Sequence, residues 1–198
     1  MNISAVILAG GQSSRMGRDK ARLAFEEESL LARQLRKVRT LNPAEVFISG
    51  RSGEDYSAFN CPVLFDLEPG FGPLGGIERA LHAAGSPLLL VLAVDLPHMT
   101  NGFLQKMFAG CDRLTGAVPK LNGRLEPLAA IYPKRCHAVA GDFIARSRHA
   151  VCEFAEACLE ERALRTFRVA HADVGCFANW NSPADFPADR QASCNPQL

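Results

Sequence analysis

Residues 2–11 read NISAVILAGG, a short apolar run that ends in two adjacent glycines. A second apolar run, LLLVLAV at residues 88–94, is entirely aliphatic and is followed at once by Asp95. Continuous apolar runs of this length, bounded by glycine or by a polar residue, are typical of strands that are covered on both faces in a parallel sheet. We therefore expect both runs to be buried strands, with residues 88–94 at the centre of the sheet.

Around these two runs, strand patterns alternate with segments of helical period. Further strands are expected at residues 45–49, 62–65, 116–121, 126–132 and 164–170. Helices are expected after a cap at Ser29, from Pro73 to near Gly85, after a cap at Thr100, from Pro133 onward, and over residues 151–161. This alternation predicts an α/β fold, namely a single Rossmann-like three-layer sandwich with a mostly parallel mixed sheet. The domain is expected to span residues 1–186, with residues 187–198 as a flexible tail.

The dipeptide Asn122-Gly123 separates two of the expected strands. Asn-Gly is the strongest short signal for a β-hairpin, because both residues tolerate positive φ. We therefore expect residues 116–121 and 126–132 to be joined by a hairpin turn. Pro133 follows directly and is expected to open the next helix.

Composition excludes several classes of protein. The chain is 47% hydrophobic and 22% charged, which is typical of a globular domain, and its 22 basic residues nearly balance 21 acidic ones. Nucleic acid and anionic membrane surfaces are therefore not expected as partners. The first apolar run is too short for a signal peptide or a membrane span. The seven cysteines are scattered without a Cys-x-x-Cys pair, which favours reduced thiols and a cytoplasmic location.

The loop after the first strand carries the main functional signal. Residues 8–20 read LAGGQSSRMGRDK. Gly10 and Gly11 would let backbone amides approach a ligand closely, and Arg15 and Lys20 would bring two cations to the same place. The loop lacks both the Gly-Lys-Ser/Thr of a Walker loop and the Gly-x-Gly-x-x-Gly of a dinucleotide fingerprint. We interpret it as a polyphosphate-binding loop of another kind.

Two carboxylates follow other expected strands. Asp66 ends a short strand and precedes GFGPLGG at residues 70–76. An ionised carboxylate can accept two hydrogen bonds from the ring N–H and the amino group of guanine, although Asp66 could equally cap its own loop. Asp95 closes the central strand, where it could hold Mg²⁺ against phosphate oxygens or accept hydrogen bonds from the backbone.

These motifs together resemble a known family. LAGGxSxRMGxDK at residues 8–20 resembles the signature of sugar-phosphate and cofactor nucleotidyltransferases, and its RMGxDK ending is most similar to molybdenum cofactor guanylyltransferases. The Asp before Gly-Pro-Leu-x-Gly, the Asp-x-Pro at residues 95–97 and the Asn-x-Asn-Ser-Pro at residues 179–183 also match patterns of that family. The resemblance covers roughly residues 3–186.

The resemblance implies a role for each matching residue. Leu8, Ala9, Gly10 and Lys20 would hold the nucleotide, with Gly11 beside them, and Arg15 matches the family's loop arginine. Asp66 would contact guanine, Gly72 and Gly76 would let a helix start approach the ligand, and Asp95 would bind magnesium. Asn179 and Asn181 would meet the metal or the pterin, and residues 124–128 resemble a segment near the acceptor pocket. Arg15, Lys20 and Asp95 would be the catalytic residues.

Other polar residues receive an ordinary structural interpretation. Arg33, Arg36, Lys37 and Arg39 are expected to form a solvated face of one helix, and His98 is expected in a solvated loop. One position departs from the family: Ser49-Gly50-Arg51 stands where such enzymes often place an asparagine after the second strand. A side-chain contact to the ribose or the base is therefore expected to be missing.

The expected reaction is transfer of GMP from GTP to molybdopterin, with Mg²⁺ as cofactor and pyrophosphate as the second product. Transfer from CTP to the same pterin, or from another nucleoside triphosphate to a sugar phosphate, remains open. A non-catalytic GTP-binding module is the alternative from another class. GTP and molybdopterin are the expected ligands, and docking to molybdoenzymes or to a GTP-binding adaptor is a possible further interaction.

Overall fold

The computed structural model describes residues 2–10, 24–25, 28–65 and 70–179, and all structural statements below concern these residues. Its centre is an eight-stranded sheet with the strand order β10-β7-β9-β6-β1-β4-β5, and β8 pairs with β7. The strands are β1 (Ile3–Leu8), β4 (Glu45–Gly50), β5 (Val63–Phe65), β6 (Leu88–Ala93), β7 (Gly116–Leu121), β8 (Arg124–Leu125), β9 (Ala129–Pro133) and β10 (Leu164–Arg168). A separate small ribbon pairs β2 (Ala24–Phe25) with β3 (Glu28–Ser29).

Most pairings in the main sheet are parallel. β1 lies between β4 and β6 and is parallel to both, and β10 is parallel to β7. β9 is antiparallel to β6 and to β7. The expected mostly parallel mixed sheet is therefore confirmed.

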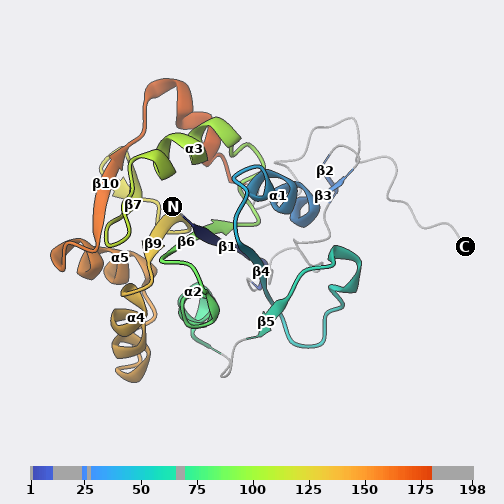
Figure 1. Cartoon of the computed structure of the whole chain (residues 1–198), viewed down its shortest axis with the longest axis horizontal. Helices are drawn as coiled ribbons and strands as arrows, with labels where there is room; N and C mark the ends of the chain where they lie inside the picture. Colours follow the sequence, from blue (N-terminus) through green and yellow to red (C-terminus); the bar gives the residue numbers. More distant parts are fainter. Residues whose placement is uncertain (1, 11–23, 26–27, 66–69, 180–198) are drawn as a thin grey trace, which may run out of the picture.

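Helices cover both faces of the sheet (Figure 1). They are α1 (Leu30–Arg39), α2 (Gly72–Ala83), α3 (Asn101–Ala109), α4 (Cys136–Ala145) and α5 (Val151–Glu160), with short 3₁₀ helices η2 (Ser57–Phe59) and η3 (His171–Phe177). α1, α3 and η3 pack on one face, where they share a core with the side chains of Ile7 and Leu92. α2, α4 and α5 pack on the other face, against Val6 and Val91. These layers are the expected three-layer sandwich.

The helix caps form where the sequence predicted them. The hydroxyl of Ser29 accepts a hydrogen bond from the amide of Ala32, and the hydroxyl of Thr100 accepts one from the amide of Phe103. Each bond satisfies an amide that has no partner within the helix. α2 begins at Gly72, one residue before Pro73.

The hairpin prediction was correct about the turn and wrong about the second strand. β7 does turn at Asn122-Gly123, where both residues have positive φ, but it pairs there with the two-residue β8. Residues 126–128 belong to neither strand, and β9 begins at Ala129. β9 then pairs with β6 in addition to β7. Pro133 ends β9, and α4 begins at Cys136.

Two negative findings hold for the described part of the chain. None of its helices is long and apolar enough to cross a membrane. Its six cysteines are free thiols, while Cys194 lies outside the described residues together with the predicted tail at 187–198.

Close approach of β7 and β9 requires a glycine at Gly116. A Cβ atom there would lie 1.9 Å from the carbonyl oxygen of Ile131. We expect Gly116→Ala to lower the free energy of unfolding by about 2 kcal/mol or more, because the two strands would have to separate. Urea unfolding would measure this change.

Gly141 provides the matched control, since a Cβ atom there would meet nothing within 4 Å. Gly141→Ala should raise the free energy of unfolding by about 0.5–1 kcal/mol, because alanine is the better helix former. Equal effects of the two substitutions would contradict the close approach of the strands.

Candidate functional site

The carboxyl ends of four parallel strands meet at one edge of the sheet. In register, Leu8 of β1 is paired with Ser49 of β4 and with Ala93 of β6, and Gly50 is paired with Phe65 of β5. The ends of β1, β4, β5 and β6 at Leu8, Gly50, Phe65 and Ala93 therefore lie side by side. Ligands of open α/β sheets bind beyond such an edge, so this is the candidate site.

The end of β1 is tied to both of its neighbours. The amide of Ala9 donates to the carbonyl of Ser49 over 2.9 Å, and the amide of Val94 donates to the carbonyl of Leu8 over 3.1 Å. Gly10 and Asp95 each lie two residues beyond the paired residues Leu8 and Ala93. The sequence predicted that the glycine turn and the carboxylate of Asp95 bind the same ligand. The segments that carry them start from paired residues at the same edge of the sheet.

The order of the strands makes this place a topological switch point. From β1 the chain proceeds to β4 and β5 on one side, and after α2 it returns to β6 on the other side of β1. The two connections cover opposite faces of the sheet: α1 precedes β4 and lies on one face, and α2 connects β5 to β6 and lies on the other. Ligands of open α/β sheets bind at switch points of this kind.

The start of α2 reaches the same edge. Gly72 has a φ of 55°, a conformation that glycine adopts without strain. One turn later, a Cβ atom at Gly76 would lie 2.3 Å from Ser49 Oγ and 3.2 Å from Leu8 Cδ2. The two glycines that the sequence singled out therefore have separate structural roles in α2. Gly72 allows the backbone conformation at its start, and Gly76 lets the helix pack directly on the ends of β1 and β4. The amino end of a helix is a favourable site for an anion.

The structure explains the glycine at position 50. A Cβ atom there would lie 2.6 Å from the ring of Tyr56 and 2.9 Å from Val63 Cγ1. Tyr56 is buried, and its hydroxyl accepts a hydrogen bond from the amide of Arg51 over 3.0 Å. The ring of Tyr56 thus occupies the space that a side chain at Gly50 would need.

The segment at residues 124–128 lies beside the end of β6. The carbonyl of Leu128 accepts a hydrogen bond from the amide of Ala93 over 2.8 Å. Glu126 is half-buried, and burial raises the pKa of its carboxyl, while Arg124 opposes that shift. The predicted position of this segment near the site is therefore consistent with the backbone contacts.

Asn179 follows η3, which packs against the start of α3. Thr100 Oγ1 and Cys176 Sγ are 3.7 Å apart, and the rings of Phe103 and Phe177 meet edge to face. Asn179 is exposed, and its place on the acceptor side of the site stays a prediction.

The prediction of a solvated basic face on α1 was wrong for two of its four residues. Arg36 and Arg39 are exposed, but Lys37 is buried and Arg33 is mostly covered. Burial, together with the charges of Arg33 and Arg36, lowers the pKa of Lys37 to about 8. The burial of Lys37 could have been predicted from the helical period. Lys37 lies seven residues after the buried Leu30 and therefore on the same face of the helix.

Five of the predicted site residues lie outside the described part of the chain. They are Gly11, Arg15, Lys20, Asp66 and Asn181. Their assignments stay predictions.

The described residues suit a metal ion that the substrate helps to bind better than one held by protein ligands alone. No cluster of three or more His, Cys, Asp or Glu residues that could hold a metal occurs in the described ranges. A cage built from protein ligands alone is thus absent from that part of the molecule. Mg²⁺ is commonly bound by one or two carboxylates together with substrate phosphates, and Asp95 at the end of β6 suits this arrangement.

The fold and this edge define an α/β protein with a candidate ligand site at its switch point. Residues 5–174 match the MobA-like NTP transferase domain. The chain belongs to this family of nucleotidyltransferases, and it is a transferase enzyme.

Relatives named probable molybdenum cofactor guanylyltransferase are similar over nearly their whole length. The one from Opitutus terrae is 35% identical, with 96% of this chain and 95% of the relative covered. The one from Pelotomaculum thermopropionicum is 33% identical, with 93% and 90% covered.

Solved structures share the fold. Molybdopterin-guanine dinucleotide biosynthesis protein A from Archaeoglobus fulgidus has a TM-score of 0.72 at 22% identity, with 92% of this chain and 94% of that chain covered. The 2-C-methyl-D-erythritol 4-phosphate cytidylyltransferase from Thermus thermophilus has a TM-score of 0.71 at 20% identity, with 93% and 95% covered.

The contact between Gly76 and Ser49 gives a test of how α2 is seated. Gly76→Ala should lower the free energy of unfolding by about 1–3 kcal/mol, because the new methyl group would overlap Ser49 Oγ. Ser49→Ala removes that oxygen, so the double variant should recover part of the loss. Urea unfolding of the four proteins in a double-mutant cycle measures the coupling. Strict additivity of the two substitutions would contradict the contact.

Proposed function

We propose that this enzyme transfers GMP from GTP to molybdopterin, with Mg²⁺ as cofactor, and releases pyrophosphate. The relatives from Opitutus terrae and Pelotomaculum thermopropionicum carry names for this activity. The observation that carries the proposal is the pairing of Leu8 with Ala93, which starts the Gly10 turn and the Asp95 turn next to each other.

The chemistry suits a site without a nucleophilic side chain. The terminal phosphate of molybdopterin attacks the α-phosphorus of GTP, a new P–O bond forms, and the bond to the β-phosphate oxygen breaks as pyrophosphate leaves. A phosphate nucleophile is already ionised near neutral pH, so no general base is required. The enzyme must instead align the two substrates and offset their crowded negative charge.

Each proposed residue has one part in that task. The backbone at Ala9 and Gly10 lies against the nucleotide, and Arg15 and Lys20 place cations on its phosphates. The carboxylate of Asp66 accepts hydrogen bonds from guanine, and the start of α2 at Gly72 meets an anionic group.

Asp95 would hold the magnesium ion. The ion, when bound, offsets charge on the phosphate oxygens of the triphosphate. Asn179 and Asn181 would contact the acceptor side of the site. The proposal includes a cytoplasmic location, which the scattered free cysteines favour. It also includes docking to a molybdoenzyme or to a GTP-binding adaptor.

A panel of four nucleoside triphosphates tests the choice of nucleotide. With molybdopterin and Mg²⁺, we expect pyrophosphate release with GTP to exceed release with ATP, CTP or UTP by at least about tenfold, a difference of about 1.4 kcal/mol in transition-state binding. Preference for CTP would identify a cytidylyltransferase, a reaction that the solved structure from Thermus thermophilus carries in its name. Binding of GTP without pyrophosphate release, with molybdopterin or a sugar phosphate, would leave only a binding module.

Replacement of Asp95 tests the metal site. Asp95→Ala should lower kcat by about 10²–10³, equivalent to roughly 2–4 kcal/mol of transition-state stabilisation, while circular dichroism and thermal unfolding stay near those of the parent. Asp142→Ala is the matched control, because Asp142 is an exposed carboxylate on α4 that pairs with Arg146 over 3.0 Å. Near-normal turnover by Asp95→Ala would remove Asp95 from the mechanism.

A further inference from the structure

Three side chains of α1 donate hydrogen bonds to the backbone of the turn that carries Asp95. Gln34 Nε2 donates to the carbonyls of Leu96, over 2.6 Å, and Ala93, over 3.4 Å. Lys37 Nζ and Arg33 Nε both donate to the carbonyl of Pro97, the latter over 3.1 Å. The accepting carbonyls lie on both sides of Asp95 in the chain.

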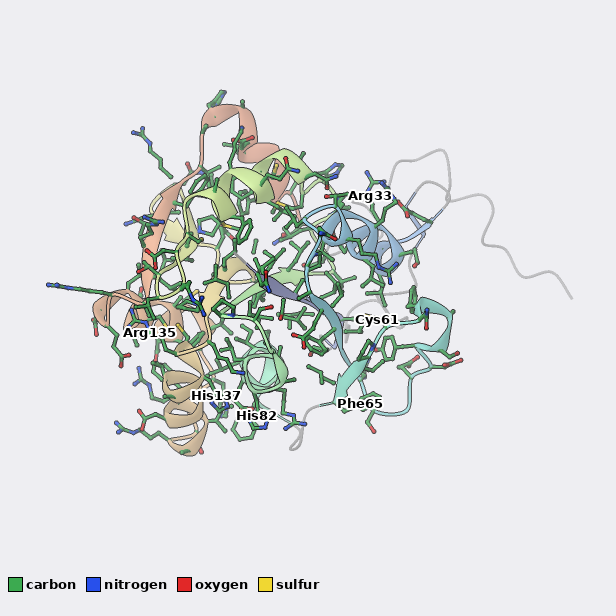
Figure 2. All side chains as sticks on the ribbon, in the orientation of Figure 1. Arg33, Cys61, Phe65, His82, Arg135 and His137 are labelled. Atoms are coloured by element: carbon green, nitrogen blue, oxygen red, sulfur yellow. The ribbon has the colours of Figure 1, made fainter. Side chains whose placement is uncertain are left out.

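The spacing on the helix explains how the three donors reach one turn. Arg33 and Lys37 are four residues apart and therefore share a face of α1, and Gln34 lies next to that face. Figure 2 labels Arg33 on this helix. α1 itself is firmly seated, since Leu31, Leu35 and Val38 are almost completely buried in the core. The donors are thus held by a helix that cannot easily shift.

The burial of these donors costs stability. Gln34 is fully buried, and its Oε1 accepts no hydrogen bond from the described residues. Lys37 is only 7% exposed. Because burial holds the pKa of Lys37 below that of a free lysine, the protonated form at neutral pH makes the folded state less stable than a neutral side chain of the same size would. An apolar pair at these positions would pack against the core without that cost.

The turn is held by packing and by backbone hydrogen bonds as well, since the side chains of Leu96 and Met99 are buried in the core. The amides of Ala93 and Val94 bond to Leu128 and Leu8, and these bonds hold the end of β6 within the sheet. Beyond Val94, the amide of Met99 donates a hydrogen bond to the carbonyl of Leu96. The donors from α1 add side-chain hydrogen bonds to three carbonyls on either side of Asp95.

We propose that Gln34 and Lys37 are positioning residues, which fix the turn at Ala93–Pro97 and thereby set the place of the Asp95 carboxylate. The proposal rests on the proposed function for the role of Asp95 and adds two residues outside the ligand loops. Neither residue touches the reacting atoms. Each acts through the backbone that carries the carboxylate, as the outer partners of metal ligands do in other sites.

Lys37→Met and Gln34→Met test the proposal, because methionine fills a similar volume without donating a hydrogen bond. In Lys37→Met the carbonyl of Pro97 keeps its bond from Arg33, so no buried acceptor loses its last donor. Arg39→Met is the matched control: it removes one positive charge from the same helix at an exposed position, away from the turn.

Four measurements separate positioning from mere stability. Thermal unfolding reports the fold. Electron paramagnetic resonance reports Mn²⁺ binding in the presence of α,β-methylene GTP, which is not cleaved at the α-phosphorus. Hydrogen–deuterium exchange reports the amides of residues 93–99, and steady-state turnover with GTP completes the set.

We expect Lys37→Met to keep or raise Tm, by up to about 2–4 °C, and to weaken Mn²⁺ binding by about tenfold or more. Exchange over residues 93–99 should become faster, and kcat should fall more than KM changes. Gln34→Met should show the same pattern in binding and exchange. Arg39→Met should match the parent in all of these measurements.

Unchanged Mn²⁺ binding and unchanged exchange in folded Lys37→Met would overturn the proposal. Should Gln34→Met not fold, Lys37→Met decides alone. If the parent enzyme releases no pyrophosphate with any triphosphate, the proposed function fails. Exchange over residues 93–99 then still decides whether α1 holds the turn.

Discussion

The rest of the site depends on the hydrogen bond from the amide of Val94 to the carbonyl of Leu8. This bond continues the pairing of β1 with β6 to the last residue of each strand, so the two following turns start side by side. Its counterpart on the other side of β1 joins Ala9 to Ser49. Because backbone hydrogen bonds fix the register of paired strands, a glycine turn and a carboxylate far apart in the sequence start at the same edge of the sheet.

A second constraint acts from the two helical layers. Gly76 lets α2 rest on the ends of β1 and β4 from one face, and α1 binds the turn after β6 from the other. The carboxyl edge of the sheet thus lies between two helices. α2 packs closely against it because Gly76 has no side chain, and α1 donates hydrogen bonds to it from buried side chains. Phosphoryl transfer depends mainly on positioning, so rigid support of this kind suits the proposed reaction.

Sequence patterns predicted the local elements well wherever one signal dominated. The caps at Ser29 and Thr100 form as expected, and the turn at Asn122-Gly123 is present. The second strand of that hairpin was placed too early, because the apolar pattern of residues 126–132 does not show that β9 must also pair with β6. The basic residues of α1 were misread for a related reason: charge alone does not tell which face of a helix meets a polar backbone turn.

The sequence by itself determined the class of fold, the glycine loop, the strand-terminal aspartate and the family resemblance, because these depend on residue type and spacing along one segment. Only the tertiary structure decided which of those segments adjoin. It brought the turns at Gly10 and Asp95 together, filled the space beside Gly50 with Tyr56, and buried Lys37 against Pro97. The reason is physical: periodicity records how each segment meets its own neighbours, whereas contacts across the sheet are set by strand order and by the packing of distant helices.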